Sequence, residues 1–402
     1  MSWEILKIED FADVIGGGTP STKNNSYWNG DIPWIGPRDL SNWSFKYIDR
    51  GDRNISNLGL EKSSAKLLPV KTVLMTSRAP IGYVAIAKNE ICTNQGFQNL
   101  VCKENIADPN FVYYLIKEHI DKIKAVASGA TFPEISKTKL KGIELTIPPL
   151  QTQKRIADIL SAYDDLIENN LKRIKLLEQA AQNIYKEWFV NLRFPGHENT
   201  SINQETGLPE GFEEKSLSDL VSKITDGTHD SPKPKDKGFY LVTGKNINNG
   251  FLDFSNAYLI SKEDHDKVQK RSFLELGDIL YSNIGTIGST TIVDQDFKYS
   301  CKNVIIFKPL EFHSFFLYCF LTNTHTKSLF LQGLAGSSQK FISLTYARGY
   351  KEIFPSTDSI VLFHNTVKDF FKQKKLLHVQ NQKLKAARDI LLPRLMNRTI
   401  EV

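Results

Sequence analysis

The 402-residue sequence has few cysteines and no long hydrophobic run. Its most apolar window, FFLYCFL at residues 315–321, is too short to span a bilayer, and no signal peptide opens the chain. The cysteines lack the Cys-x-x-Cys spacing of zinc and redox sites, so we expect buried, reduced thiols at all four positions: Cys92, Cys102, Cys301 and Cys319. These absences argue against membrane proteins and disulfide-rich secreted proteins, and we expect a soluble, cytoplasmic protein.

The sequence also lacks the common catalytic motifs. It has no GxxxxGK[ST] phosphate loop, no GxGxxG fingerprint, no HExxH, no GxSxG and no Cys/His set at zinc spacing. Asp226, His229 and Asp230 gather in the stretch TDGTHDSP, but a polar turn needs the same residue types. We therefore expect no catalytic site, no bound metal and no cofactor in this chain.

The bulk composition is that of a globular protein with a basic balance. Charged residues make up 24% and hydrophobic residues 41%, and the length suggests two or three domains. The chain has 51 Lys and Arg against 45 Asp and Glu, a formal net charge of +6. This balance is compatible with a polyanionic partner, although many unrelated proteins share it.

The sequence contains a long internal repeat. Three segments of the first half recur in order at offsets of 206 or 207: residues 73–82 in 279–288, residues 32–40 in 239–247, and residues 128–148 in 335–355. An offset held over this distance indicates a tandem duplication of a unit of about 200 residues. Each unit begins with short β-patterned runs and polar turns and closes with a charged, helix-patterned segment.

The closing segment of the first unit, from about Gln151 to Phe189, has a heptad pattern. Its repeating positions, here called the seam, alternate in steps of four and three: Ile156, Leu160, Tyr163, Ile167, Asn170, Ile174, Leu177, Ala181, Ile184 and Trp188. Adding 207 gives the second seam: Phe363, Val367, Phe370, Lys374, Leu377, Asn381, Leu384, Arg388, Leu391 and Leu395. At about 1.5 Å per residue the first helix would be roughly 57 Å long.

The two helices can bury their seams against each other. Parallel and antiparallel pairing are both open topologically, and each helix could instead pack only on its own domain. Antiparallel pairing of positions whose numbers sum to 551 places Asn170 opposite Asn381 and Trp188 opposite Phe363. A buried Asn pair fixes register at some cost in stability, so we favour the antiparallel arrangement.

The β-patterned halves have loops rich in basic, amide, small polar and aromatic residues. Such side chains suit phosphates, base edges and stacking, although any single one of them can be an ordinary solvated loop residue. The framework recurs while the loops differ, since TPSTKNNS has become THDSPKPK, which favours two different ligands or sequences. The candidate DNA-binding residues are Thr19, Ser21, Lys23, Asn24, Tyr27, Trp28, Arg38, Arg78, Asn94, Gln95, Thr131, Thr228, His229, Lys233, Lys235, Lys245, Asn246, Asn283, Ser338, Gln339 and Lys340.

A Pro-Pro step separates the first β-patterned half from its helix. The stretch IPPL at residues 147–150 lacks the Asn, Asp or Ser and the aromatic residue that flank the prolines of adenine methyltransferase loops. It also recurs, as IFPS at residues 353–356, in the second unit. We therefore interpret it as a junction, where proline ends a strand and directs the chain into the helix.

Three stretches carry a resemblance to a known family: GGTPSTKNNSYWNGDIPW, DGTHDSP and, most specifically, IPPLQTQKRIADILSAYDDLIENN. With them, essentially the whole chain resembles the specificity subunit of a type I restriction-modification enzyme. The resemblance implies two target-recognition domains, each reading one half of a split double-stranded DNA sequence, and two conserved helices on which two modification subunits dock. It also implies that S-adenosylmethionine, ATP and Mg belong to partner subunits, including two restriction subunits where these exist.

The resulting expectation is an α+β fold with an internal pseudo-twofold repeat and an antiparallel coiled coil. Its parts are target-recognition domain 1 at residues 1–149, the central helical spacer at 150–200, target-recognition domain 2 at 201–356, and the distal helix at 357–402. The expected function is non-catalytic recognition of a bipartite DNA target in a methyltransferase complex. The alternative is a coiled-coil scaffold that binds protein or glycan through its loops.

Overall fold

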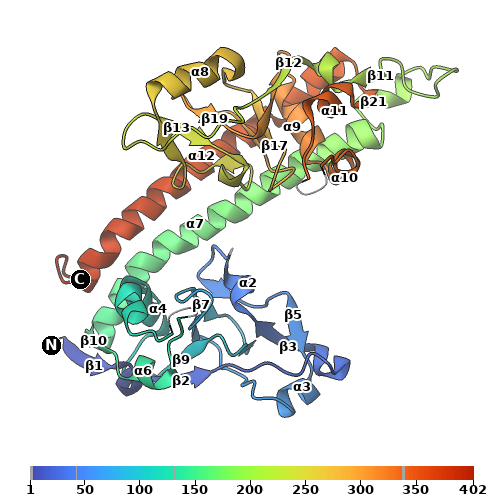
Figure 1. The fold of residues 1–402 in the computed structure, drawn as a ribbon. Helices are drawn as coiled ribbons and strands as arrows, with labels where there is room; N and C mark the ends of the chain where they lie inside the picture. The colour runs from blue at the N-terminus through green and yellow to red at the C-terminus, as the bar shows by residue number, and fades with distance from the viewer. Residues whose placement is uncertain (1–2, 42, 130–132, 337–339) are drawn as a thin grey trace. The chain divides into compact units, whose positions relative to one another are not determined.

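The computed structural model describes residues 3–41, 43–129, 133–336 and 340–402. The chain forms two compact units, labelled here by number: unit 1 comprises residues 1–173 and 376–402, and unit 2 comprises residues 174–375. None of the helices in these described ranges is both long and apolar enough to cross a membrane. Figure 1 traces the elements of both units.

Unit 1 is built on a five-stranded sheet. Its strand order is β2 (Ala12–Gly16), β9 (Gln98–Cys102), β6 (Val73–Met75), β7 (Val84–Ala87) and β4 (Tyr47–Ile48). A three-stranded sheet contains β5 (Arg53–Ile55), β3 (Trp28–Ile35) and β8 (Cys92–Thr93), and β1 (Glu4–Lys7) pairs with β10 (Glu144–Ile147). Helix α4 (Pro109–Glu118) packs on the large sheet and buries Phe111 and Tyr114 in the main core. The remaining short helices are α1 (Ile8–Phe11), α2 (Pro37–Ser41), α3 (Asn57–Glu61), α5 (Ile120–Ala125) and α6 (Lys137–Lys141).

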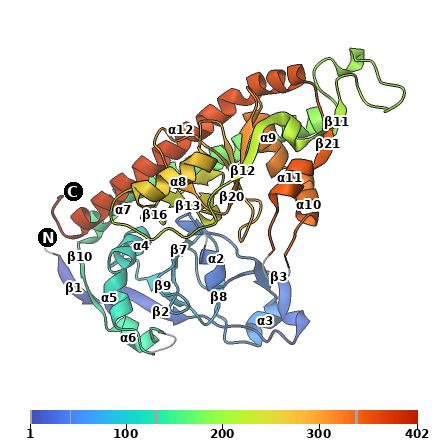
Figure 2. The same ribbon diagram turned by 45° about the horizontal axis from the view of Figure 1, so that its top comes forward.

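Unit 2 repeats this plan with additions (Figure 2). Its four-stranded sheet runs β12 (Val221–Asp226), β20 (Val304–Pro309), β17 (Ile279–Ser282) and β18 (Thr290–Ile292). The three-stranded sheet runs β16 (Tyr258–Ile260), β13 (Phe239–Val242) and β19 (Ser300–Cys301), and β11 (Glu213–Ser216) pairs with β21 (Lys351–Phe354). Unit 2 also contains a hairpin of β14 (Ile247–Asn248) and β15 (Phe251–Leu252). Its shorter helices are α8 (Lys262–Ser272), α9 (Ser314–Thr322), α10 (Thr324–Gln332) and α11 (Leu344–Gly349).

The repeat predicted from the sequence extends to individual hydrogen bonds. In unit 1 the Ile135 amide donates to the Ser77 carbonyl oxygen, and in unit 2 the Ile342 amide donates to the Asn283 carbonyl oxygen, both at 3.0 Å. The one parallel pair of each three-stranded sheet is also equivalent, β3 with β8 and β13 with β19. Cys92 and Cys301 lie on these equivalent strands, where burial raises the pKa of each thiol to about 12. Both therefore stay protonated and pack as small apolar side chains.

Two long helices carry the seams. Helix α7 spans Leu150–Tyr185 and α12 spans Thr357–Met396. The α-helix expected to reach Phe189 ends four residues earlier, because Lys186–Val190 form a π-helical turn. This wider turn lets Trp188 and Phe189 both face Phe363, with ring centroids 5.9 and 5.3 Å away.

Within unit 1 the two helices pair antiparallel in the predicted register. The Asn170 side-chain amide donates to Asn381 Oδ1 at 2.9 Å, and both residues are buried. Asn381 in turn donates to the carbonyl oxygen of Ile167 at 3.3 Å. Arg388 forms an ion pair with Asp164, so a later residue of α12 meets an earlier residue of α7. This polar pair confirms that Asn170 and Asn381 face each other inside the seam.

Within unit 2 the same antiparallel direction holds. Lys374 Nζ lies 2.5 Å from Glu178 Oε1, and Trp188 lies against Phe363. Lys374 occupies a seam position and is only 5% exposed, which is unusual for lysine. Its ammonium group is held by Glu178, by the Tyr318 hydroxyl at 3.2 Å and over the Phe251 ring at 4.7 Å. The heptad pattern thus predicted the burial of a residue whose chemistry alone would place it on the surface.

The buried side chain of Gln153 holds the junction between β10 and α7, and no sequence motif indicated this role. Gln153, in the first turn of α7, accepts from the Asp108 amide at 2.9 Å and donates to the carbonyl oxygens of Ile106 and Pro148 at 2.8 and 2.9 Å. These bonds tie the strand end, the start of α4 and the start of α7 together. The stretch after β10 therefore acts as an architectural junction.

Candidate nucleic-acid interface

Three loops of unit 1 converge: residues 16–30, 76–80 and 93–99. The Gly18 amide donates to the Thr93 carbonyl oxygen at 2.8 Å, and the Ser77 amide donates to the Gly96 carbonyl oxygen at 2.7 Å. Gly17 makes this possible, because a Cβ there would collide with the Asn94 carbonyl oxygen. These backbone bonds hold the loops together whatever side chains the loops carry.

The converging loops bring five of the predicted residues into one neighbourhood, here called the first loop face: Thr19, Arg38, Arg78, Asn94 and Gln95. The Thr19 hydroxyl donates to the side-chain oxygen of Gln95, and Asn94 Oδ1 accepts from the Gly96 amide at 2.8 Å. Arg38 follows Pro37 on α2, and a Cβ on Gly96 would lie 3.2 Å from Pro37 and 3.6 Å from Arg78. This face therefore combines the Arg78 guanidinium group with amide and hydroxyl groups, and the exposed Arg38 lies beside it on α2.

Arg78 is positioned by an acidic neighbour. Its Nη1 lies 3.5 Å from Glu134 Oε2, and both side chains remain more than a third exposed. A surface pair of this kind contributes little to stability, so a stronger anion can displace the carboxylate. Arg78 can therefore exchange its partner for a phosphate or a base edge without a large loss to the fold.

Trp28 was predicted as a contact, but it anchors the loop from inside. Its indole nitrogen donates to the Ser21 carbonyl oxygen at 3.1 Å, and that of Trp34 donates to the Gly18 carbonyl oxygen at 2.9 Å. The two rings pack edge to face at 5.2 Å, and the Arg53 guanidinium covers Trp28 at 3.5 Å. Because Trp28 is buried, we remove it from the direct contacts that we propose. Trp34 and Arg53 were missed. The pairing of β3 is irregular between Trp28 and Ile32, so the period of a regular strand gave no signal that the two rings meet, and Arg53 comes from the neighbouring strand β5.

The rest of the first loop splits between structural and exposed residues. Asn24 Oδ1 caps a short 3-10 turn by accepting from the Ser26 amide at 3.1 Å, and the half-buried Tyr27 accepts from the Ser56 amide through its carbonyl oxygen at 3.0 Å. Ser21 and Lys23 are exposed. They remain candidates for phosphate contact, while Thr131 lies outside the described residues.

In unit 2 the predicted loop residues line a polar cavity of about 680 Å³. Three predicted residues, Thr228, Lys233 and Lys235, share this cavity with Lys267 and Arg271 of α8. The two α8 cations were missed because the equivalent stretch of unit 1 forms only the short helix α3 (Asn57–Glu61), so the repeat gave no signal for them. Glu263 and Asp264 also line the cavity, which sets limits on where a phosphate can sit.

A buried carboxylate holds the loop beside this cavity. Asp226 lies 2.8 Å from His229 Nε2 and pairs with the Arg271 guanidinium. The other ring nitrogen of His229 lies 3.1 Å from Asn303 Oδ1, so the ring is oriented from both sides while its side chain remains 61% exposed. Asp226 and His229 are therefore engaged with their own chain, and His229 presents one face of its ring outward.

The remaining predicted residues of unit 2 follow the same division. Asn246 accepts from the Thr243 amide at 2.9 Å, and Asn283 donates to the Ile342 carbonyl oxygen at 3.4 Å. Both asparagines are buried, so we also remove them from the proposed contacts. Lys245 and Lys340 are exposed and stay candidates, while Ser338 and Gln339 lie outside the described residues.

The family model for the type I restriction modification DNA specificity domain matches the chain twice, at residues 1–179 and 209–359. The chain belongs to this family. Its two matches coincide with the two halves of the repeat and together cover most of the sequence. Relatives that match this chain are named as specificity subunits of type I restriction enzymes.

Individual relatives agree with the family. The chain is 34% identical to the type I restriction enzyme MjaIX specificity subunit of Methanocaldococcus jannaschii, over 98% of this chain and 92% of that protein. It is 26% identical to the type I restriction enzyme HindI specificity subunit of Haemophilus influenzae, over 96% of this chain and 94% of that protein. The fold is similar to the crystal structure of the S subunit of a type I restriction-modification system from M. genitalium, with a TM-score of 0.57, 18% identity and coverage of 98% and 96%.

Proposed function

We propose that this specificity subunit reads a bipartite double-stranded DNA target, with one recognition domain for each half-site. The observation that carries the proposal is the pairing of one repeated scaffold with two different sets of exposed basic and amide side chains. Unit 1 offers Arg38, Arg78 and Gln95, whereas unit 2 offers Lys233 and Lys235 beside the cations of α8. Two domains that read the same sequence would not need different loops.

The chemistry of these side chains favours DNA over the alternative of a scaffold for protein or glycan. Lysine and arginine neutralise phosphates, and arginine and amide side chains match guanine and adenine edges in the major groove. The recognition domains would correspond to residues 1–149 and 201–356. The helical segments 150–200 and 357–402 would hold them and set the length of the unread gap between half-sites.

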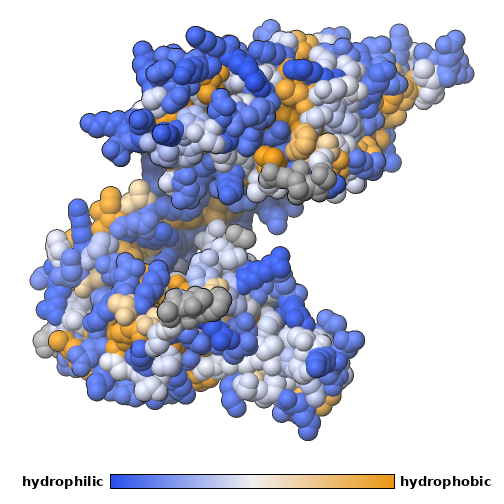
Figure 3. Space-filling view, viewed as in Figure 1, coloured by the Kyte–Doolittle hydropathy of each residue, from blue (hydrophilic) through white to orange (hydrophobic). Residues whose placement is uncertain are grey.

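We further propose that two modification subunits dock on the outer faces of α7 and α12. Leu362, Leu376 and Ile390 follow each other at intervals of 14, which is two heptads, and each is more than 40% exposed. Leu176 on α7 is 62% exposed. On the face that it draws, Figure 3 shows hydrophobic patches on a largely hydrophilic surface. Single exposed apolar side chains are normal on a protein surface, so what supports this docking is their recurrence at one heptad position of α12.

The partners would supply the chemistry that this chain lacks. The modification subunits would bring S-adenosylmethionine and methylate adenine, and two restriction subunits, where present, would bring ATP and Mg. The complex would act in the cytoplasm, where the DNA is. The specificity subunit would contribute position and sequence choice only.

A binding titration of the chain with its modification subunit tests this function. We expect discrimination between a duplex that carries the methylated target and a scrambled duplex, with affinity that falls steeply as salt rises. Arg78→Ala and Lys245→Ala are expected to weaken DNA binding and leave assembly unchanged. Equal affinity for target and scrambled duplexes at every salt concentration would refute the proposal.

A further inference from the structure

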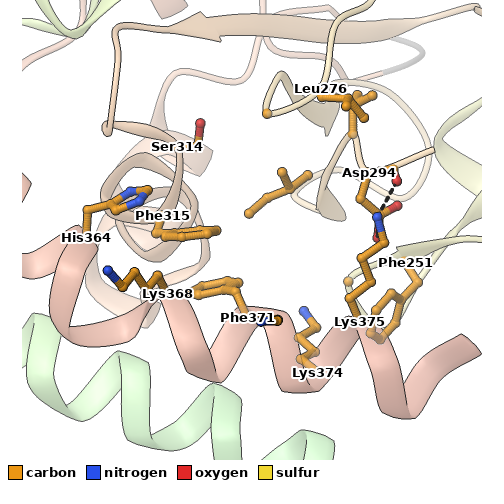
Figure 4. Close-up of a pocket in the computed structure, with 15 residues that line it drawn as sticks. Phe251, Leu276, Asp294, Ser314, Phe315, His364, Lys368, Phe371, Lys374 and Lys375 are labelled. Atoms are coloured by element: carbon orange, nitrogen blue, oxygen red, sulfur yellow. Dashed lines mark hydrogen bonds and ion pairs between the residues drawn. The ribbon is translucent and has the colours of Figure 1, made fainter. Parts of the chain in front are cut away.

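Unit 2 contains a second cavity, of about 480 Å³, that the recognition loops do not use. It lies where α12 meets the β14–β15 hairpin, the loop before β17, the end of β18 and the start of α9 (Figure 4). Its floor and walls are largely apolar: Phe251, Leu276, Ile292, Val293, Phe315 and Phe371. Its rim is basic, since α12 contributes Lys368, Lys372 and Lys375.

The floor is a preformed aromatic stack. Phe315 and Phe371 lie ring to ring, with centroids 4.3 Å apart and planes 8° from parallel, and His364 stacks on the other side of Phe315 at 4.7 Å. Burial lowers the pKa of His364, so its ring is uncharged at neutral pH and extends the apolar floor. A side chain that enters the cavity therefore meets flat rings that are already ordered.

The edge of the cavity exposes a large apolar side chain. Leu276 is 68% exposed and faces the stack from the opposite wall in Figure 4. An exposed leucine beside a preformed aromatic floor gains about 25 cal/mol for each Å² that a partner covers. The geometry therefore favours an occupant with a bulky apolar group.

The charges of the rim are not balanced within the unit. Lys375 is held by Asp294, donating to its carbonyl oxygen at 2.6 Å, and Lys374 is buried against Glu178. Among the described residues, the ion pairs of α12 in unit 2 are made by Lys374 and Lys375, and neither Lys368 nor Lys372 takes part in one. Lys368 Nζ donates only to the neutral side chain of Asn365, at 3.2 Å. Like charges four residues apart destabilise a helix slightly, so this pair is kept at a small cost to α12. An acidic partner would remove that cost.

We propose that this cavity binds an acidic segment of the modification subunit. An aromatic or leucine side chain of the segment packs on the Phe315–Phe371 stack, and carboxylates on either side of it pair with Lys368 and Lys372. The inference rests on the proposed docking of modification subunits and names one contact within it. DNA is the less favoured occupant, because a phosphate backbone would engage the lysines and leave the stack and Leu276 uncovered.

Charge reversal tests the rim. In titrations of the full chain with the modification subunit, Lys368→Glu with Lys372→Glu is expected to weaken assembly at least ~10-fold, because two attractive contacts become repulsive. The matched control is Lys262→Glu with Lys270→Glu, the same change of charge at two exposed positions on α8 of the same unit. The control is expected to assemble like the wild type. Normal assembly of the Lys368/Lys372 variant would overturn the proposal. If that variant assembled normally but bound DNA less tightly, the two lysines would be DNA contacts instead.

Photo-crosslinking identifies the occupant. A benzoylphenylalanine at Leu276, which is too exposed to disturb the core, is expected to crosslink to a modification-subunit peptide that contains at least two carboxylates. Absence of that crosslink in the assembled complex, or a crosslink to DNA, would contradict the proposal. Target and scrambled duplexes are compared with the wild-type complex in the same experiment. A complex that discriminates them without this crosslink retains the proposed function and loses only the cavity contact, whereas a complex that fails to discriminate loses the function itself.

Discussion

The ion pair between Glu178 and Lys374 in unit 2 can be broken from either side, and the two single substitutions should differ. Lys374 is 6% exposed at its side chain and Glu178 is 31% exposed. Lys374→Met removes the buried charge and leaves a carboxylate that still reaches water. Glu178→Gln leaves an ammonium group enclosed by Tyr318 and Phe251. The buried, unpaired lysine in Glu178→Gln should therefore destabilise unit 2 more than the partly hydrated glutamate in Lys374→Met.

The magnitudes follow from burial. Breaking a fully buried pair destabilises by about 3–5 kcal/mol, and the glutamine oxygen can still accept one hydrogen bond, so we expect about 2–3 kcal/mol for Glu178→Gln. For Lys374→Met we expect about 1 kcal/mol or less, because the methionine can fill the same space between aromatic rings and Glu178 is partly hydrated. The two variants should therefore differ by about 2 kcal/mol.

The pKa of Lys374 gives a second test. Burial disfavours its charge, yet Tyr318 and Glu178 together hold its pKa above the ordinary value of 10.5. A raised pKa in the folded state stabilises fully below the unfolded value and loses that stabilisation as pH rises through the folded value. The stability of unit 2 should therefore fall as the pH rises above 10.5 in the wild type. The Lys374→Met variant should lack the part of this fall that comes from Lys374.

Hydrogen exchange measures the effect locally, which matters because a chain with two units need not unfold in one step. The amides of residues 174–185 and 362–375 should lose about 30-fold more protection in Glu178→Gln than in Lys374→Met, since 1.4 kcal/mol is a factor of ten. The double variant Lys374→Met with Glu178→Leu should return close to wild-type protection. Equal loss in both single variants, or a larger loss in Lys374→Met, would refute the reasoning.

Three further predictions concern the register and the loops. Asn170→Leu and Asn381→Leu should each lower the local opening free energy of the seam by about 1–3 kcal/mol by leaving a buried amide unsatisfied, and the double variant should regain it; additive losses by hydrogen exchange would contradict the pairing. Lys233→Ala or Lys235→Ala should each reduce the salt slope of DNA binding by about 1 without changing assembly, and an unchanged slope would exclude a phosphate contact. Trp28→Ala should speed proteolytic cleavage within residues 16–30 and leave cleavage in unit 2 unchanged; equal resistance to protease would show that the indole does not anchor the loop.

The seam and the repeat could be predicted from the sequence because both are periodic. A step of four and three residues specifies one face of a helix whatever the side chain is, which is why Asn170, Asn381 and even Lys374 were placed inside. The constant offset likewise predicted equivalent strands, such as β6 and β17, which begin 206 residues apart at Val73 and Ile279. Periodicity does not depend on knowing the tertiary contacts.

The loops could be predicted only in part because their side chains have no period. Composition indicated an interface, but it could not show that Trp28 bonds inward to the Ser21 carbonyl oxygen or that Asn283 bonds to Ile342. It also could not bring Lys267 and Arg271 to the cavity beside residues 228–235, because that contact depends on where an unrepeated helix packs. Such placements depend on tertiary packing and on individual side-chain hydrogen bonds, and only the fold reveals them.

Base-resolution mapping of methylated adenines, in cells that carry this chain with its modification subunit, tests the central claim most directly. We predict one bipartite motif with a fixed unread gap. Replacement of residues 201–356 by the same segment of a relative should change one half of the motif and preserve the other half. A continuous motif, or a change of both halves after the replacement, would contradict the assignment of one half-site to each domain.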